Sequence, residues 1–424
     1  MIVTLSLEIL LLTASASLPR ELLQENMKTS ADFLCQKPPF FYLTKKDVSS
    51  RIDRHADAIL LNIAYCYDSS SPFLSVIKSS YYYDAYKNEN ENLLYRVQNE
   101  STPTYDYMRY WHGSLAFIRP LFIFFSLQEI YVINACLLAL LILVSCLFIR
   151  KDFDIATSLC FFIACILSTV WYVPFSLEYM PVFVITLLAI PLLSVLNHRF
   201  PGTCLYAFLV LGSVTSYTDF LTTETITLLI PLILFVLKEN EKKILFCIKS
   251  GICWLIGYSV TWSFKWALYS LTVSSDGLSD AVTQTAYRTG GAYSDSMNFI
   301  QQINGSLLRN VRCLFPFSVL NDTLGFVLPP LLLLAIAMVF YIIKKQKNMP
   351  DIVLVLFLIG LLPYLRYVVL SNHSYIHYFF TFRAQLVSIF CLLLIFRHGT
   401  DTAFLQKQFK KLKNNLQNKR KKRR

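Results

Sequence analysis

The sequence predicts an all-α polytopic membrane protein with a helical first extracellular loop. Of its 424 residues, 55% are hydrophobic and only 16% are charged, whereas soluble domains hold about 25% charged residues. Apolar runs of about 20 residues, the length of a membrane-spanning helix, recur along most of the chain. Basic residues gather in alternate loops between these runs. Together these observations predict about ten transmembrane helices.

The first apolar run covers residues 1–18 and is expected to be the first transmembrane helix. Its end, Ala14-Ser15-Ala16, also suits a signal-peptide cleavage site, so whether residues 1–18 are cleaved stays open. Glu8 interrupts the run and fits neither alternative well. The other expected spans are Ile130–Ile149, Ile155–Val173, Tyr179–Leu196, Leu205–Tyr217, Thr225–Leu237, Ile244–Leu271, Leu324–Ile343, Ile352–Leu370 and Tyr378–Phe396.

The spans and the polar stretches between them divide the chain into six parts. Residues 397–424 form a basic tail with eleven Lys or Arg and one Asp, which is a net charge of +10 out of +12 for the chain. Such a tail beside a span suits anionic lipid headgroups, and without a folded basic domain it does not indicate nucleic-acid binding. The other parts are a first helix (1–18), an extracellular loop with interfacial helices (19–128), a bundle (129–271), a second extracellular loop (272–323) and C-terminal helices (324–396).

The distribution of charge predicts the orientation of the chain. Alternate loops contain Arg150-Lys151, His198-Arg199, Lys242-Lys243 and Lys344-Lys345. All of these fall on one side, which the positive-inside rule makes cytoplasmic. An even number of spans then places both termini in the cytoplasm and the long polar loop outside. The expected localisation is the plasma membrane.

Two carboxylates of the first outer loop are the candidate catalytic residues. Asp53 and Asp57 are four residues apart, so on a helix they share one face. Carboxylates at a membrane surface suit general-base chemistry or metal binding. A solvated helix face with an N-cap is the alternative interpretation. The chain shows no Cys/His metal spacing, so no metal ligands are predicted, while a divalent metal cofactor stays open.

The other candidates are polar residues that fall on the same outer side. Guanidinium groups match phosphate oxygens with two parallel hydrogen bonds, although an arginine near headgroups also serves as a simple anchor. Asp219 and Glu224 have helix capping as their alternative. His373 and His377, four apart, suit proton transfer or metal ligation, with interfacial hydrogen bonding as the alternative. The expected substrate-binding residues are Asp106, Arg109, His112, Asp219, Glu224, Arg288, His373, His377 and Arg383.

Four stretches carry a resemblance to known proteins. SRIDRHADAILLNIAYCYD, YDYMRYWHGSLAFIRPLF, SYTDFLTTETITLLIPLI and SNHSYIHYFFTFRA resemble an uncharacterised family of bacterial multi-pass membrane proteins. The architecture resembles the GT-C glycosyltransferases, without a shared signature sequence. That resemblance implies a sugar donor linked to polyprenyl phosphate, used at the outer membrane face, and a catalytic Asp in the first outer loop. Here Asp53 and Asp57 lie further from the first span than that acid does in many GT-C enzymes.

The expected function is therefore a membrane glycosyltransferase that modifies a cell-envelope glycopolymer or lipid. The resemblance implies that Asp57 or Asp53 acts as the base and that Arg288 and Arg383 hold the phosphate. The expected partners are the polyprenyl-phosphate-linked sugar and anionic membrane lipids, without nucleic acid and with the oligomeric state open. The alternatives are a transporter or flippase of lipid-linked saccharides and a non-catalytic membrane scaffold.

Overall fold

The computed structural model is nearly all helical. It describes residues 1–45, 47–200, 202–238, 243–290, 297–315, 327, 332, 335, 336 and 351–399. Most of the predicted span Leu324–Ile343 and nearly all of the basic tail lie outside the described residues. The described strands form only two short antiparallel pairs, β1 with β2 and β3 with β4.

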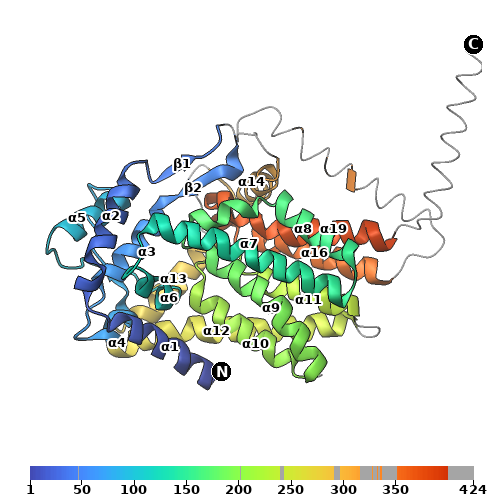
Figure 1. Cartoon of the computed structure of the whole chain (residues 1–424), viewed down its shortest axis with the longest axis horizontal. Coiled ribbons are helices and arrows are strands. Elements are labelled where there is room, and N and C mark those ends of the chain that lie inside the picture. Colours follow the sequence, from blue (N-terminus) through green and yellow to red (C-terminus); the bar gives the residue numbers. More distant parts are fainter. Residues whose placement is uncertain are drawn as a thin grey trace, which may run out of the picture.

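Residues 19–126, called the cap below, gather at one end of a helical bundle (Figure 1, blue to cyan, left). The helix α1 (Ile2–Ala16) precedes the cap. The elements of the cap are η1 (Arg20–Leu23), α2 (Gln24–Cys35), β1 (Phe40–Tyr42), η2 (Val48–Ser50), β2 (Arg51–Asp53), α3 (Arg54–Cys66), α4 (Pro72–Lys78), β3 (Ser80–Tyr81), α5 (Glu89–Gln98), β4 (Tyr105–Asp106) and α6 (Leu115–Leu121).

The bundle follows the cap, and its long helices run side by side away from it (Figure 1). Its elements are α7 (Leu127–Asp152), α8 (Ile155–Leu167), η3 (Val170–Phe175), α9 (Met180–Arg199), α10 (Cys204–Thr218), α11 (Ile226–Lys238), α12 (Lys243–Thr272), α13 (Gly277–Gly290), α14 (Phe299–Arg312), α16 (Asp351–Val369), α17 (Ser371–Ile376), α18 (Tyr378–Thr381), η4 (Phe382–Gln385) and α19 (Leu386–Gly399).

Among the described residues, five helical segments are long and apolar enough to cross a membrane: α7, α9, α12, α16 and Tyr378–His398. A sixth results if α1 and the segment Arg20–Cys35, which meet at an angle of 80°, count as one broken span. The helices α8, α10 and α11 are apolar but shorter, with 13, 15 and 13 residues. The chain is thus consistent with a multi-pass membrane protein. Five or six segments of the described residues are long enough to span, whereas about ten spans are expected, and the expected span Leu324–Ile343 lies mostly outside the described residues.

Among the described residues, the basic side chains at the ends of α7, α9, α11 and α19 lie together at the end of the bundle opposite the cap. Asp152, at the end of α7, pairs with Lys238 of α11 and lies 3.6 Å from the Nε2 atom of His198 on α9. Asp154 pairs with Arg397 at the end of α19. Asp154 is the N-cap of α8, so these contacts join the ends of five helices at one end of the bundle.

Small residues allow a close crossing of α10 and α12. A Cβ atom added at Gly212 of α10 would lie 2.0 Å from the carbonyl oxygen of Trp254, and one added at Gly257 of α12 would lie 2.0 Å from that of Leu209. The two backbones therefore touch, as small residues allow in membrane helix pairs. This crossing fixes the position of α12, whose face forms part of the site described below.

Buried cations attach the cap to the bundle and to α1. Arg119 is fully buried and donates to the carbonyl oxygens of Ser15, Leu18 and Ala64. The guanidinium group of Arg119 therefore connects α6 with α1 and α3 through protein carbonyls. Lys265 of α12 donates to the Val76 carbonyl and the Ser79 hydroxyl at the end of α4.

We expect the cap to be extracellular, as the basic loops predict. Tyr86 is 99% exposed in the cap, and Arg199 is exposed at the opposite end of the bundle. A membrane-impermeant maleimide should therefore label Tyr86→Cys in intact cells and Arg199→Cys only after permeabilisation, each measured above the labelling of the parent chain. Labelling of Arg199→Cys in intact cells would contradict this topology.

Candidate active site

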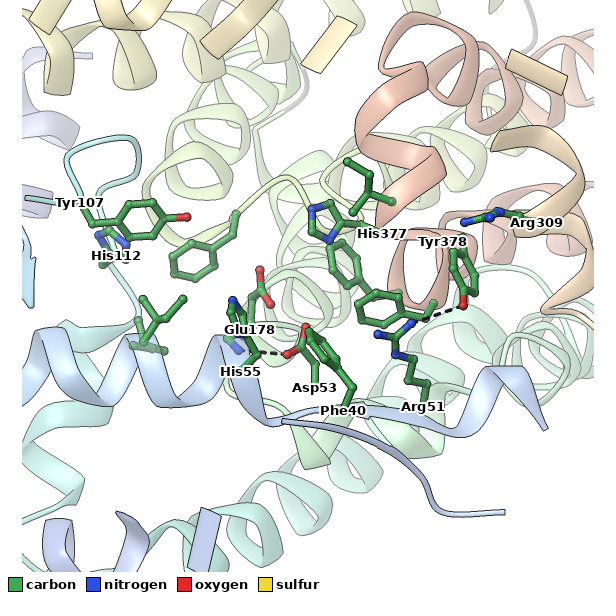
Figure 2. Close-up of a pocket in the computed structure, with 17 residues that line it drawn as sticks. Phe40, Arg51, Asp53, His55, Tyr107, His112, Glu178, Arg309, His377 and Tyr378 are labelled. Carbon is green, nitrogen blue, oxygen red and sulfur yellow. Dashed lines mark hydrogen bonds between the residues drawn. The ribbon is translucent and has the colours of Figure 1, made fainter. Parts of the chain in front are cut away.

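A cavity of about 410 Å³ lies where the cap meets the ends of the bundle helices. Ligand pockets commonly have this size and form between such layers. Figure 2 shows Tyr107 and His112 at one end of it, Arg51 and Arg309 at the other, and a group of acids and histidines between them. The cavity is lined by Phe40, Arg51, Asp53, His55, Ala56, Ile59, Leu60, Tyr107, His112, Glu178, Phe220, Arg309, Ile376, His377, Tyr378, Phe379 and Phe380.

Asp53 brings a buried carboxylate to the middle of this cavity. It is the N-cap of α3, and its Oδ1 atom accepts a hydrogen bond of 2.9 Å from the Ala56 backbone N–H. Its Oδ2 atom has a more distant donor, the Tyr179 hydroxyl at 3.4 Å. Burial raises the pKa of Asp53 to about 6, although these donors and the nearby Arg51 charge act in the opposite direction. One carboxylate oxygen is thus fixed by the helix and the other is largely free to accept a proton.

Asp57 lies behind this cavity rather than in its wall. Its carboxylate is fully buried and accepts hydrogen bonds from the Tyr131 hydroxyl, from the Leu177 N–H at 2.9 Å and from the Ser176 hydroxyl at 3.3 Å. Burial raises the pKa of Asp57 to about 7. Because the hydrogen bonds reach the segment before Glu178, Asp57 holds that segment in place. Asp53 is the N-cap of α3 and lines the cavity, whereas Asp57 lies within α3 and is buried behind the cavity wall. The two carboxylates therefore do not form one exposed pair.

Glu178 is the second carboxyl group in the cavity, and it is not among the residues predicted from the sequence. It follows η3 and precedes α9, and its Oε2 atom is buried without a hydrogen-bond partner among the described residues. Burial, followed by the charges of Asp53, Asp57 and Asp219, raises the pKa of Glu178 well above its ordinary value. Two acids in one cavity with pKa values pushed apart are a common arrangement for a base and a proton-bearing acid.

Two arginines form the cationic end of the cavity (Figure 2). The Arg51 guanidinium lies between the rings of Phe40 and Phe379, at 4.4 and 4.2 Å from their centroids, and donates to the Tyr378 hydroxyl at 3.3 Å. Arg309 donates to the carbonyl and hydroxyl oxygens of Tyr375. Neither forms an ion pair with a carboxylate of the described residues. Their charge is therefore available to a polar or anionic substrate group.

The histidines at the site are neutral at ordinary pH. Burial lowers the pKa of His377 to about 3 and that of His373 and His112 well below the ordinary value. The rings of His373 and His377 lie 4.6 Å apart, but only His377 lines the cavity. His112 also lines it and has a φ of 55°, a left-handed conformation that is uncommon for a non-glycine residue and is associated with functional sites.

A second cavity, called the groove below, has a volume of about 390 Å³ and contains three of the predicted substrate-binding residues. Arg109, Glu224 and Arg288 line it together with Trp254, Leu255, Tyr258, Trp262 and Trp266 of α12. Leu255 is 57% exposed on a helix that is long enough and apolar enough to span a membrane, so the groove opens on an apolar outer surface of the bundle. Arg288 donates to the Tyr110 hydroxyl at 2.7 Å.

The groove and the cavity are neighbours. The Arg288 charge contributes to the lowered pKa of His377, which lines the cavity. Tyr110 of the groove packs against Phe220 and His112 of the cavity, with ring centroids 5.4 and 6.2 Å apart. These aromatic rings separate an apolar space on the outer surface of the bundle from a polar space at the base of the cap.

Four predicted substrate-binding residues line neither space. Asp106 accepts from Ser80 and Tyr269, and Asp219 accepts from the backbone N–H and hydroxyl of Thr222. Arg383 of η4 is buried and donates to the Phe379 and Ser49 carbonyls, so it attaches η2 of the cap to the segment that precedes the last helix. His373 packs behind His377. These contacts stabilise the walls of the site rather than its surface.

Arg51 and Glu178 are the functional candidates that the sequence analysis missed. Each lies one or two residues from a recognised feature, Arg51 before Asp53 and Glu178 at the start of an expected span. The signal that could have identified Glu178 is a carboxylate placed at the cap end of an apolar run, where an ionisable residue is costly without a function.

Comparison of the chain with protein families, with curated proteins and with solved structures gives no match. The family and the GT-C architecture inferred from the sequence therefore stay predictions. Among the described residues there is no group of three or more His, Cys, Asp or Glu side chains arranged to hold a metal ion. The arguments below depend on the geometry of the cavity and the groove.

Proposed function

We propose that the chain is a membrane glycosyltransferase that uses a polyprenyl-phosphate-linked sugar at the outer face of the plasma membrane. The observation that carries the proposal is the pair of buried carboxyl groups, Asp53 and Glu178, that line one cavity beside an apolar groove on the outer surface of the bundle. The polyprenyl chain occupies the groove along α12, and Arg288 and Arg109 bind its phosphate. The sugar then extends past Tyr110 into the cavity.

In the proposed reaction, Asp53 removes the proton from an acceptor hydroxyl. The hydroxyl oxygen bonds to the anomeric carbon while the bond between that carbon and the phosphate oxygen breaks. Polyprenyl phosphate leaves with the electron pair of that bond, and the proton stays on Asp53 Oδ2. The Arg51 charge keeps Asp53 the more acidic of the two carboxyl groups, so that Asp53 is ionised while Glu178 is protonated.

A transporter or flippase of lipid-linked saccharides would need a polar path through the bundle. The described bundle core has a large apolar cluster that includes Phe161, Phe183, Phe208 and Phe390. Some of its buried polar groups, such as Glu8 with Ser213 and Thr215 with Thr227, are hydrogen-bonded to one another. A scaffold would have no use for two buried acids that face an open cavity, because burying such groups without a function lowers stability. These observations favour the transferase over both alternatives.

The test is transfer by the purified chain reconstituted in nanodiscs with radiolabelled polyprenyl-phosphate hexoses and the envelope polysaccharide of the source cell. We expect labelled polysaccharide to form with release of polyprenyl phosphate. The rate should fall by about tenfold per pH unit below pH about 6, because Asp53 loses its base form as it is protonated.

Arg51→Gln provides an internal check on this pH profile. Removing the cation raises the pKa of Asp53, so the midpoint of the acid limb should move to higher pH. Arg199→Gln, at the far end of the bundle, is the matched control and should leave the midpoint unchanged. A profile that is flat between pH 5 and 8 would exclude Asp53 as the base.

A further inference from the structure

Four tyrosines form one continuous aromatic face on the ribbon β3–β4. Tyr81 pairs with Tyr105 across the ribbon, and side chains two residues apart in a strand point to the same side. Tyr83 and Tyr107 extend this face beyond the paired residues, with neighbouring ring centroids 5.6 to 6.4 Å apart. We call these four residues the tyrosine face.

The tyrosine face runs from the surface of the cap into the candidate active site. Tyr83 and Tyr105 are 41% and 39% exposed, whereas Tyr107 lines the cavity and packs 5.2 Å from the His112 ring. Arg109 donates to the Tyr105 hydroxyl and lies 5.7 Å from the Tyr107 ring centroid. The rings are thus partly held by packing and still open to water at one end.

We infer that the tyrosine face binds the saccharide chain of the acceptor and guides its end into the cavity. Tyrosine has an apolar ring and a hydrogen-bonding hydroxyl, which suits a ligand with apolar C–H faces and many hydroxyl groups. It also gives a large contact area for little loss of side-chain entropy. This inference depends on the proposed function, since a glycosyltransferase needs a route for a water-soluble acceptor.

The position of the face argues for a saccharide rather than a lipid or a peptide. It lies on the cap, and its inner end, Tyr107, lines the cavity and is not among the residues that line the groove. A lipid would approach through the groove. A peptide would be expected to extend the ribbon through backbone hydrogen bonds, whereas the feature exposed here is a row of rings.

The test is binding of water-soluble oligosaccharides, released from the envelope polysaccharide of the source cell by partial acid hydrolysis, to the full chain in nanodiscs. Truncation of each exposed ring should weaken binding by about tenfold, so Tyr83→Ala with Tyr105→Ala should lose most of it. Tyr83→Trp with Tyr105→Trp should bind like the wild type, because the ring faces remain. Tyr86→Ala is the matched control, since Tyr86 is 99% exposed in the same cap and lies outside the tyrosine face.

Equal amounts of envelope peptides and of polyprenyl-phosphate vesicles serve as competing probes. Retention of the oligosaccharides that depends on Tyr83 and Tyr105 supports the inference. The inference is overturned if the oligosaccharides are not retained or if the double truncation leaves their retention unchanged. It is also overturned if the double truncation weakens peptide or vesicle binding more than oligosaccharide binding. Binding is measured without turnover, so the two failures can be told apart. A chain that binds the oligosaccharides through Tyr83 and Tyr105 but transfers no sugar would overturn only the proposed function. A chain that transfers sugar but binds them independently of these tyrosines would overturn only this inference.

Discussion

Asp53→Asn is expected to lower the rate of sugar transfer by roughly 10²–10⁴-fold, the usual cost of losing a general base. The amide keeps the size of the side chain, and its oxygen still accepts from the Ala56 N–H, so the N-cap hydrogen bond of α3 is kept. The variant should therefore unfold at nearly the wild-type temperature. Transfer to envelope polysaccharide by the reconstituted chain measures the rate.

Two matched variants separate the base from its surroundings. Asp68→Asn changes an exposed carboxylate of the same cap and should retain full activity. Asp57→Asn should mainly lower thermal stability, because its carboxylate accepts three hydrogen bonds that hold the segment before Glu178. An active Asp53→Asn variant together with an inactive and stable Asp57→Asn variant would return the role of base to Asp57.

Arg366→Met is expected to lower the free energy of unfolding by about 3–5 kcal/mol, because it leaves a buried carboxylate without its partner. Arg366 of α16 contacts Glu224 through two hydrogen bonds of 2.8 and 3.1 Å, and both side chains are buried. It also donates to the Leu221 carbonyl at 2.7 Å and thereby holds the turn between α10 and α11. Thermal unfolding in nanodiscs should show a clearly lower midpoint.

The double variant Arg366→Met with Glu224→Gln should recover part of this loss, since the neutral amide costs less to bury than an unpaired carboxylate. Arg150→Met, an exposed change at the other end of the bundle, is the control for losing one arginine. A midpoint for Arg366→Met equal to that of the control would mean that the ion pair contributes nothing to the stability of this turn.

The helical class of the chain follows from local sequence. Apolar runs such as 130–149 and 352–370 form helices α7 and α16 because a backbone in lipid must satisfy its hydrogen bonds within the segment. The N-cap at Asp53 is also a local feature, since a carboxylate before a helical run accepts from the backbone two or three residues later. The helices of the first loop were predictable from helical spacing of apolar residues. The convergence of polar residues at one end was predictable from the alternation of basic and other loops along the chain.

The length of individual spans was less predictable. The expected spans 205–217 and 225–237 correspond to α10 and α11, which are too short to meet the length criterion alone. Hydropathy marks where a segment is apolar, but it does not show whether the segment crosses lipid or packs inside the bundle. Ile226, Ile230 and Ile233 of α11 are buried against other helices, so their apolar character reflects the protein core.

The sequence by itself determined which residues form helices and that polar groups gather at one end of a membrane bundle. Only the tertiary structure decided which of those groups share a space. It places Asp53 in one cavity with Glu178 and Arg51, and it buries Asp57 behind the wall of that cavity. It also places Arg288 in the groove and connects η2 with η4 through Arg383. The physical reason is that cavities and raised pKa values arise from burial and from charges distant in sequence, which local spacing does not encode.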